Sequence, residues 1–416
     1  MTAATAWERR LYLAAHPFAY PLLRGLARRG PVVRVPGVGV VVNDASAARE
    51  VLMDGDAFRK DGPGSPGDLW TPVLGPSVLL NMEGEAHRAL RRRLAGLFTP
   101  GYAEGLCERV LAEPLARIEA RLAHGDAVDL ADAMRVLAGA VIGEVVGLDA
   151  GAGPRAEAAY RDLFEQGERI VSMVSLRTRR LSPEAVGRAR AVLGPLGDIA
   201  AKAYADGDER TVMGRMRALG LSEDEARGAA GAFFLTGTET VATLLPRLIA
   251  LLHDSGALGR VAADLTAPAD AAPAPGGAPA TGGGLLDRAI DEAMRVATPT
   301  PVMLRGVRRP AAVGGVRVRP GDRVVIATHN CCRAYGPFDL DRPPPAEPRR
   351  LWFGAGPHFC IGYPLAMAEV RAVARTLLAA GPLEITRRSA ARGVLIPAYA
   401  RLDVRVAGRG TERGTP

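Results

Sequence analysis

The chain has 416 residues, of which 48% are hydrophobic and 24% charged, and 53 Lys+Arg against 45 Asp+Glu give a formal net charge of +8. These proportions are typical of a folded globular protein and exclude a globally disordered chain. A basic chain can bind nucleic acid, but only 5% of the residues are aromatic and the arginines are scattered. Every cation except Lys60 and Lys202 is an arginine, a skew typical of GC-rich codon usage. We therefore expect no nucleic-acid partner.

Cysteine content and hydropathy predict a soluble, cytoplasmic protein. Four cysteines do not make a disulfide framework in a chain of this length, and a reducing compartment suits them. The apolar opening from Leu11 to Ala27 is broken by polar residues and prolines, and no uninterrupted apolar run of about 18 residues follows. We therefore expect no membrane-spanning segment.

The N-terminal part carries β signals and then becomes helical. Residues 32–42 contain two valine-rich runs around Pro36-Gly37, a pattern that predicts a hairpin. Asp44 is a typical N-cap and predicts a helix that continues through Leu52. From about Glu85 onward, apolar residues recur at spacings of three and four for roughly 180 residues, which predicts a helical body.

The best-marked helix begins at Ser222. Ser222 and Glu225 have the spacing of a capping box, and no proline interrupts the run before Pro246. We expect the helix to end near His253, so that about thirty residues span roughly 45 Å and cross a whole domain. Because it is apolar on nearly every side, this helix should be buried.

The second half of the chain mixes helix and strand signals. Residues 266–284 are rich in Ala, Pro and Gly and predict a flexible surface loop, after which the helical pattern resumes at Leu285. The remaining expected elements are a hairpin at 313–318, a strand at 323–327, a proline-rich coil at 337–348 and a final helix at 364–379. Together these elements predict a mostly α fold with a small β region.

The segment from Phe353 to Gly362 is the most specific in the chain. Its glycines let the backbone bend sharply and approach a flat partner closely. Pro364 predicts a helix start, so Cys360 should lie just before a helix N-terminus, where free N–H groups stabilise a thiolate. A cysteine thiolate can serve as the axial ligand of haem iron. The alternative, a buried structural cysteine, is the interpretation for the other three: Cys107, Cys331 and Cys332.

The pattern Phe-x-x-Gly-x-x-x-Cys-x-Gly resembles the haem-binding signature of the cytochrome P450 family, and three further motifs agree in the same order. The resemblance runs from about residue 80 to 370. It implies one cytochrome P450 domain over residues 1–407, with a disordered tail at 408–416. It also implies a haem b between the long central helix and the cysteine loop, with the Cys360 thiolate as the axial iron ligand.

The stretch Thr236-Gly237-Thr238-Glu239-Thr240 lies in the middle of the long predicted helix. A charged Glu239 on an apolar helix is costly unless it is paired or functional; the alternative is a glutamate that reaches solvent beside a packing glycine. The stretch resembles the family's Ala-Gly-x-Glu-Thr-Thr element, which implies that Glu239 and Thr240 deliver protons during oxygen activation. Thr236 departs from that element and would add a hydroxyl near the oxygen pocket.

His87 and Arg91 have the i, i+4 spacing of one helical face. Haem carries two propionates, and buried carboxylates need charge-assisted donors. The resemblance implies that His87, Arg91, Arg305 and His358 bind these propionates. Arg350 stands where the family often has a histidine, and it could donate there as well.

Glu292 and Arg295 are three residues apart on a predicted helix. Taken alone, this spacing is typical of a surface ion pair. The resemblance implies instead a buried structural pair that receives an arginine from the coil before the cysteine loop, and Arg342 is the candidate.

The resemblance implies a monooxygenase that inserts one oxygen atom from O₂ into a small lipophilic substrate, by hydroxylation or epoxidation in secondary metabolism. Thr236, Val302 and Ile396 would line the substrate pocket. No flavin- or nicotinamide-binding segment is predicted, so electrons would come from a ferredoxin and a ferredoxin reductase. Two alternatives stay open: coupling, ring closure, desaturation or peroxide-driven oxidation at the same haem, and a non-catalytic haem sensor.

Several arginines should flank the cysteine side of the molecule, where they could meet an acidic ferredoxin. They are Arg88, Arg92, Arg93 and Arg349.

Overall fold

The computed structural model describes the chain except residue 1 and residues 63–64, 175–177, 179, 267–283 and 409–416. The fold is mostly helical (59%) with a small β region, as the sequence predicts. Nearly all of the loop predicted at 266–284 and of the tail predicted at 408–416 lies outside the described residues.

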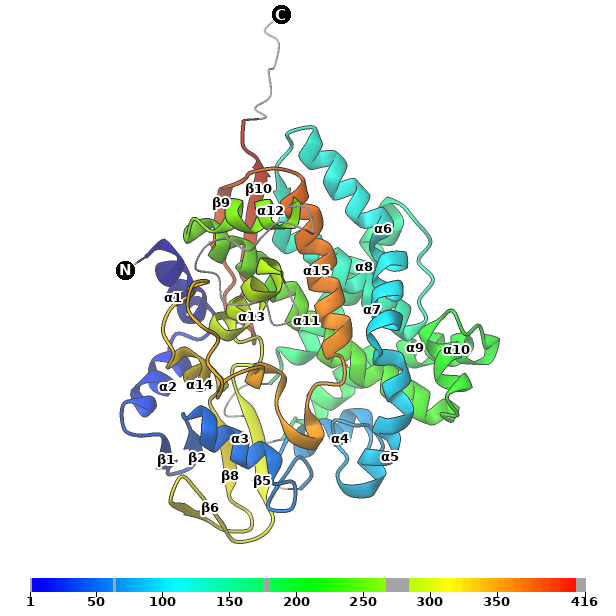
Figure 1. Ribbon diagram of the computed structural model, residues 1–416. Helices are drawn as coiled ribbons and strands as arrows, with labels where there is room; N and C mark the ends of the chain where they lie inside the picture. Colours follow the sequence, from blue (N-terminus) through cyan, green and yellow to red (C-terminus); the bar gives the residue numbers. More distant parts are fainter. Residues whose placement is uncertain (1, 63–64, 175–177, 179, 267–283, 409–416) are drawn as a thin grey trace, which may run out of the picture.

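Helix α11 (Glu223–Asp254) runs through the middle of the helical body (Figure 1). The predicted capping box is present: Ser222 Oγ accepts from the Glu225 N–H at 3.2 Å, and Glu225 Oε2 accepts from the Ser222 N–H at 2.9 Å. Pro246 lies inside the helix without ending it. Most side chains of α11 are buried because helices pack around it. These neighbours are α7 (Leu130–Val146), α8 (Pro154–Val171), α9 (Pro183–Asp206), α13 (Leu285–Ala297) and α15 (Tyr363–Ala379).

By length and composition, α11 is the one helix among the described residues that could span a membrane. Its most apolar window is nevertheless 78% buried inside the protein. The apolar sides of α11 are therefore covered by the chain's own helices, as expected for the core helix of a large fold.

Two helices precede the predicted hairpin and were not among the predicted elements, namely α1 (Ala3–Ala15) and α2 (Ala19–Ala27). Helix α1 begins at Thr2, whose hydroxyl accepts from the Thr5 N–H at 3.3 Å. Both helices are short and separated by Pro17, so their periodicity is weak in the sequence. The remaining helices are α3 (Ala45–Met53), α4 (Pro66–Leu74), α5 (Gly84–Leu94), α6 (Pro100–Ala123), α10 (Val212–Ala218), α12 (Leu258–Thr266) and α14 (Thr328–Arg333).

A five-stranded sheet in the order β1-β2-β8-β5-β3 lies beside the helices at one end of the molecule (Figure 1). Its strands are β1 (Val32–Val35), β2 (Gly39–Val42), β8 (Arg323–Ile326), β5 (Met303–Val307) and β3 (Phe58–Arg59). The predicted hairpin at 32–42 is confirmed, with Val32 opposite Val42. Strand β2 pairs in parallel with β8, while the other neighbours are antiparallel. Gly39 has φ +124°, and a Cβ there would lie 2.1 Å from the Arg323 carbonyl oxygen, so only glycine permits this pairing.

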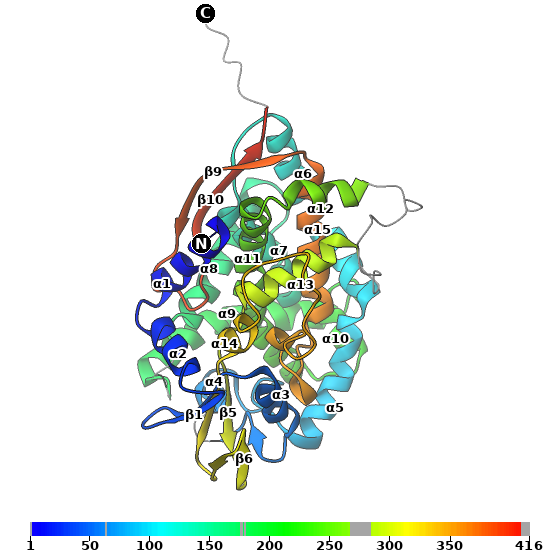
Figure 2. The same cartoon turned by 60° about the vertical axis from the view of Figure 1, so that its left-hand side comes forward.

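Two smaller sheets complete the fold. The predicted hairpin at 313–318 forms the pair β6 (Ala311–Val313) and β7 (Val316–Val318). Strands β9 (Leu383–Ala390) and β10 (Tyr399–Val406) join β4 (Val128–Asp129) at the opposite end of the molecule from β6 (Figure 2). This second sheet was not among the predicted elements, because its central strand pairs with a segment more than 250 residues away.

Candidate functional site

Cys360 lies in the tight loop that leads into α15. The loop is closed by a hydrogen bond of 2.9 Å from the Cys360 N–H to the Phe353 carbonyl oxygen. Gly354 (φ +81°) and Gly356 (φ +64°) adopt left-handed backbone conformations. A Cβ at Gly356 would lie 2.6 Å from the carbonyl oxygen of Leu52, so the loop can seat against α3 only with glycine at this position.

Cys360 is the one exposed cysteine of the four. Burial nevertheless raises the pKa of its thiol, and this effect is opposed by the N–H groups of Gly362 and Tyr363 and by the cations Lys60 and Arg91. The Cys360 side chain is accessible, yet burial affects its pKa. It therefore borders a space inside the fold rather than the outer surface. Burial also raises the thiol pKa of the three buried cysteines, which fits inert structural groups: Cys107, Cys331 and Cys332.

Three basic side chains from separate segments lie in this region: Lys60 after β3 and Arg91 on α5 act on Cys360, and Arg305 on β5 acts on Lys60. Burial lowers the pKa of Arg91, and it lowers the pKa of Arg305 to about 10. Arg91 donates to the Phe359 carbonyl oxygen at 2.6 Å, and Arg305 donates to the Leu304 carbonyl oxygen at 2.8 Å. None of the three cations forms an ion pair with a carboxylate in the part of the chain that the structure describes. None of the three side chains is therefore bonded to a carboxylate in the described structure.

Glu83 is the carboxylate that acts on Lys60 and Arg305, and both of its oxygens are engaged. Its Oε2 accepts from His358 Nε2 at 2.9 Å, and its Oε1 accepts from the backbone N–H of Lys60. Burial raises the pKa of Glu83, but the His358 hydrogen bond and the nearby cations outweigh this effect and hold it below its ordinary value. Burial lowers the pKa of His87 and of His358 to about 4. Both imidazoles are thus neutral at pH 7, and His358 donates a hydrogen bond to Glu83 rather than forming an ion pair.

The residues around Cys360 fit a haem. Lys60, Arg91 and Arg305 against Glu83 leave a formal charge of +2 when the lysine is protonated. Two carboxylates would neutralise that charge, and buried cations are stable only when such partners are supplied. The thiol of Cys360 faces the same region and is of the ligand type that binds haem iron.

The middle of α11 presents polar groups in an otherwise apolar helix. Thr236 is exposed although its neighbours Phe234 and Leu235 are buried, and its hydroxyl donates to the Ala232 carbonyl oxygen at 2.8 Å. Glu239 is only 6% exposed, and its Oε1 has no hydrogen-bond partner in the described structure. Burial, and secondarily the charge of Glu168, raises the pKa of Glu239 to about 8. This carboxyl is therefore mostly protonated at pH 7.

One aromatic side chain connects this part of α11 to the cysteine loop. The rings of Phe98 and Phe233 pack edge to face with centroids 5.2 Å apart, and Phe233 belongs to α11. A Cβ built on Gly362 would lie 3.9 Å from the Phe98 ring and 3.8 Å from Cys360 Sγ. The cysteine loop and the middle of α11 thus border a common region of the fold.

Glu292 and Arg295 form a buried ion pair of 2.6 Å, with side chains 12% and 2% exposed, rather than a surface pair. Arg295 also donates to backbone carbonyls of the following coil, including that of Pro337 at 3.0 Å. Arg342 bonds to the carbonyl oxygens of Tyr335 and Pro337 and does not contact Glu292. The second acceptor contact of Glu292 is instead with the N–H of Asp339 at 2.9 Å. Arg342 therefore supports the same coil as Arg295 without joining the pair.

The structure brings some other candidate residues into different surroundings. Arg350 has a left-handed backbone (φ 58°) and lies over the Tyr363 ring at 4.9 Å, where its charge opposes the burial that raises the pKa of Asp291. It is not among the cations that act on Glu83, so the prediction that it binds a propionate gains no support from these contacts. Val302 packs against the apolar cluster around α1, α2 and β2. Ile396 is buried, with 7% of its surface exposed.

Sequence reasoning missed Lys60, Glu83 and Glu369. Lys60 carried one signal, because a lysine stands out in a chain whose other cations are almost all arginines. Glu83 is the extended residue that precedes α5, where no periodic pattern marks it. Glu369 on α15 is 3% exposed with an unpartnered Oε1, and burial raises its pKa to about 8.

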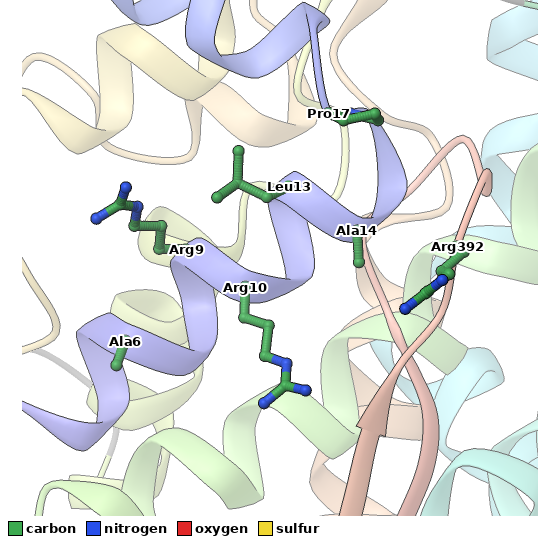
Figure 3. Close-up of a pocket in the computed structure, with 7 residues that line it drawn as sticks. All are labelled: Ala6, Arg9, Arg10, Leu13, Ala14, Pro17 and Arg392. Atoms are coloured by element: carbon green, nitrogen blue, oxygen red, sulfur yellow. The ribbon is translucent and has the colours of Figure 1, made fainter.

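A surface pocket of about 580 Å³ lies along α1 and includes Arg9, Arg10 and Arg392 (Figure 3). None of the candidate site residues lines it. The described residues also contain no cluster of three or more His, Cys, Asp or Glu that could hold a metal ion.

Comparison with known proteins shows what this chain is similar to. The family profile "Cytochrome P450" matches residues 210–388. The chain is 28% identical to "Cytochrome P-450 monooxygenase DoxA" of Streptomyces sp. (strain C5), over 86% of this chain and 88% of that protein. It is also 28% identical to "Mycinamicin IV hydroxylase/epoxidase" of Micromonospora griseorubida, over 88% and 91% of the two chains. The solved structure of a mutant of P450 EryK in complex with erythromycin B has the same fold, with a TM-score of 0.75 at 20% identity over 97% of this chain and 99% of that chain.

The fold and the named relatives thus define an oxidoreductase. The family profile, the relatives and the solved structures all point to a bacterial cytochrome P450, and the relatives are named as cytochrome P450 monooxygenases and hydroxylases.

Proposed function

We propose that the protein inserts one oxygen atom from O₂ into a small lipophilic compound of secondary metabolism, by hydroxylation or epoxidation. The full-length similarity to proteins named as a monooxygenase and as a hydroxylase/epoxidase supports this reaction class. One continuous hydrophobic cluster includes residues from Ala4 to Val406, which supports a single domain over residues 1–407.

A haem b would be held by the Cys360 thiolate on its iron and by cationic and imidazole donors on its propionates. The proposed donors are His87, Arg91, Arg305 and His358. The closeness of Cys360 to the unpaired Arg91, and of both to Lys60, supports this arrangement. When bound, the haem supplies activation of O₂. The N–H groups of Gly362 and Tyr363 would stabilise the sulfur as a thiolate, which a metal ion favours over the thiol.

The observation that carries the proposed reaction is the orphan carboxyl of Glu239. A buried acid without a partner is unfavourable for folding, so its presence in the central helix calls for a function. With a pKa near 8, Glu239 can both hold and release a proton close to neutral pH. We infer that Glu239 and the adjacent Thr240 hydroxyl form the end of the proton path into the site.

The substrate would lie beside the middle of α11. The exposed hydroxyl of Thr236 could position a polar group of the substrate, since its own proton is engaged with Ala232 and its oxygen can still accept. Ile396 and Val302 remain the proposed apolar lining.

Electrons would come from a ferredoxin and its reductase, with the ferredoxin docking on the cysteine side. Arg88 and Arg92 are 56% and 68% exposed, although both contact Glu85. Arg93 has a different role, because it pairs with Glu225 of the α11 capping box. Arg92 and the exposed Arg349 are therefore the better candidates for docking.

The test is turnover with a surrogate ferredoxin, its reductase and NADPH against a library of lipophilic metabolites, preselected by their shift of the haem spin state. We expect NADPH-dependent, O₂-dependent product that is heavier by one oxygen atom. Product that forms only with peroxide, or that is coupled, cyclised or desaturated without added oxygen, would contradict the proposed reaction. A haem protein that forms no product with any of these would be a sensor.

A further inference from the structure

Lys60 is held in place by its backbone. Its N–H donates to Glu83 Oε1, and its carbonyl oxygen accepts from the Gly67 N–H at 2.8 Å. A Cβ at Gly67 would lie 2.8 Å from the same carbonyl oxygen, so the α4 segment approaches Lys60 as closely as only glycine allows. The side chain of Lys60 therefore starts from a fixed point between β3 and α4.

The side chain of Lys60 is half-buried in a cation-rich part of the fold, and no ion pair holds its ammonium group among the described residues. Arg305 and Arg91 both act on it, and among the described residues no carboxylate pairs with it. Glu83 is close, but its two oxygens already accept from the Lys60 backbone and from His358. Burial, reinforced by Arg305, lowers the pKa of Lys60 to about 7. A lysine placed this way needs a negative partner that the chain itself does not supply.

The surroundings of Lys60 define the chemistry of that partner. With Lys60 protonated, the charges of Lys60, Arg91, Arg305 and Glu83 sum to +2. With Lys60 neutral, they sum to +1. A ligand with two carboxylates balances the first case. Lys60 also influences Cys360, so the same ligand would extend to the sulfur.

We propose that the Lys60 ammonium binds a carboxylate of the porphyrin cofactor, in addition to the residues that the family resemblance implies. This proposal rests on the haem site of the proposed function. A second possible role for Lys60 is purely electrostatic, acting on the Cys360 sulfur, and the experiment separates the two.

The first measurement is the rate at which the holoenzyme loses haem to excess apomyoglobin. We expect Lys60→Met to lose haem roughly 10- to 100-fold faster than wild type, because a hydrogen bond to a charged group is removed. Lys60→Arg keeps the charge and should recover most of that effect. Lys202 on α9, the chain's other lysine, is exposed, so Lys202→Met is a matched control and should leave the rate unchanged.

The second measurement repeats the comparison after reconstitution with the haem dimethyl ester, whose carboxylates cannot accept a charge-assisted bond as an anion. If Lys60 binds a carboxylate, wild type and Lys60→Met lose the ester at equal rates. If the difference persists with the ester, Lys60 acts on the sulfur and the proposal is overturned.

Because the chain has two lysines, acetylation with acetic anhydride gives a readout that needs no variant. Mass spectrometry should find Lys60 protected in the holoenzyme and modified after haem extraction, with Lys202 modified equally in both. Equal modification of Lys60 in both states, or a wild-type rate of haem loss for Lys60→Met, would overturn the proposal. A wild-type protein that binds no haem would instead refute the proposed function.

Discussion

Two polar residues eight positions apart on α11 have opposite surroundings. Arg247 is 1% exposed and pairs with Glu8 of α1 at 2.5 and 3.1 Å, donates to the Pro397 carbonyl oxygen at 3.1 Å and lies over the Tyr12 ring. Glu239 is buried nearly as deeply, yet one of its oxygens has no partner in the described structure. The difference separates polar groups that stabilise the fold from those that it tolerates for chemistry.

The largest expected effect concerns Arg247. Arg247→Met leaves Glu8 buried with Arg333, at 3.6 Å, as its one remaining ion-pair partner among the described residues, so the free energy of unfolding should fall by about 3–5 kcal/mol. Denaturant unfolding of wild type and variant measures this. The double variant Glu8→Met with Arg247→Met should regain most of the loss. A single variant within about 1 kcal/mol of wild type would remove the distinction between the two residues.

Glu239→Gln should lower activity rather than folding stability, the opposite of Arg247→Met. Product formation should fall roughly 10- to 100-fold, because the amide cannot release a proton as the carboxyl does, while folding stability does not fall. Thr240→Ala should also lower product formation, because NADPH is then consumed to form hydrogen peroxide or water instead of product. Steady-state product and NADPH consumption measure both effects. An unimpaired Glu239→Gln enzyme would contradict the proton path.

Glu369 is a second buried carboxyl with an unpartnered oxygen, and the pH dependence of folding stability tests it. A carboxyl whose pKa rises from 4.5 to about 8 on folding contributes stability below pH 4.5 that is lost as the pH rises through 8. Glu369→Gln should therefore be more stable than wild type by about 5 kcal/mol at pH 9 and about equal to it near pH 4.5. Thermal unfolding at the two pH values measures the difference. A variant less stable at both would mean that Glu369 has a partner.

The smallest expected effect is on electron transfer. Arg92→Glu with Arg349→Glu should slow reduction by an acidic ferredoxin about two- to five-fold at low salt, with no effect at high salt. Arg392→Glu, in the pocket along α1, is an exposed control on another face. Stopped-flow reduction at two ionic strengths measures this. A rate that does not depend on salt or on these charges would place docking elsewhere.

Local signals in the sequence were enough for the elements that local chemistry builds. The Ser222–Glu225 capping box set the start of α11, and the glycines and Pro364 around Cys360 set a turn that enters a helix. The fold class followed from such elements together with the family resemblance.

Contacts between distant segments could not be predicted in this way. Glu8 and Arg247 are 239 residues apart, and nothing in either local pattern indicates a partner. Lys60 and Glu83 meet through a backbone hydrogen bond, which no side-chain spacing encodes. Arg342 was predicted to contact Glu292. Instead the Asp339 N–H donates to Glu292, and Arg342 donates to the Tyr335 carbonyl oxygen.

The central claim is that Cys360 holds the haem as a thiolate. The absorption spectrum of the dithionite-reduced, carbon monoxide-saturated protein tests it most directly, in wild type, in Cys360→Ser and in the buried control Cys107→Ser. We expect the absorption band characteristic of haem-thiolate proteins in wild type and in Cys107→Ser, and its loss in Cys360→Ser. A wild-type spectrum without that band, or a Cys360→Ser spectrum that keeps it, would contradict the assignment.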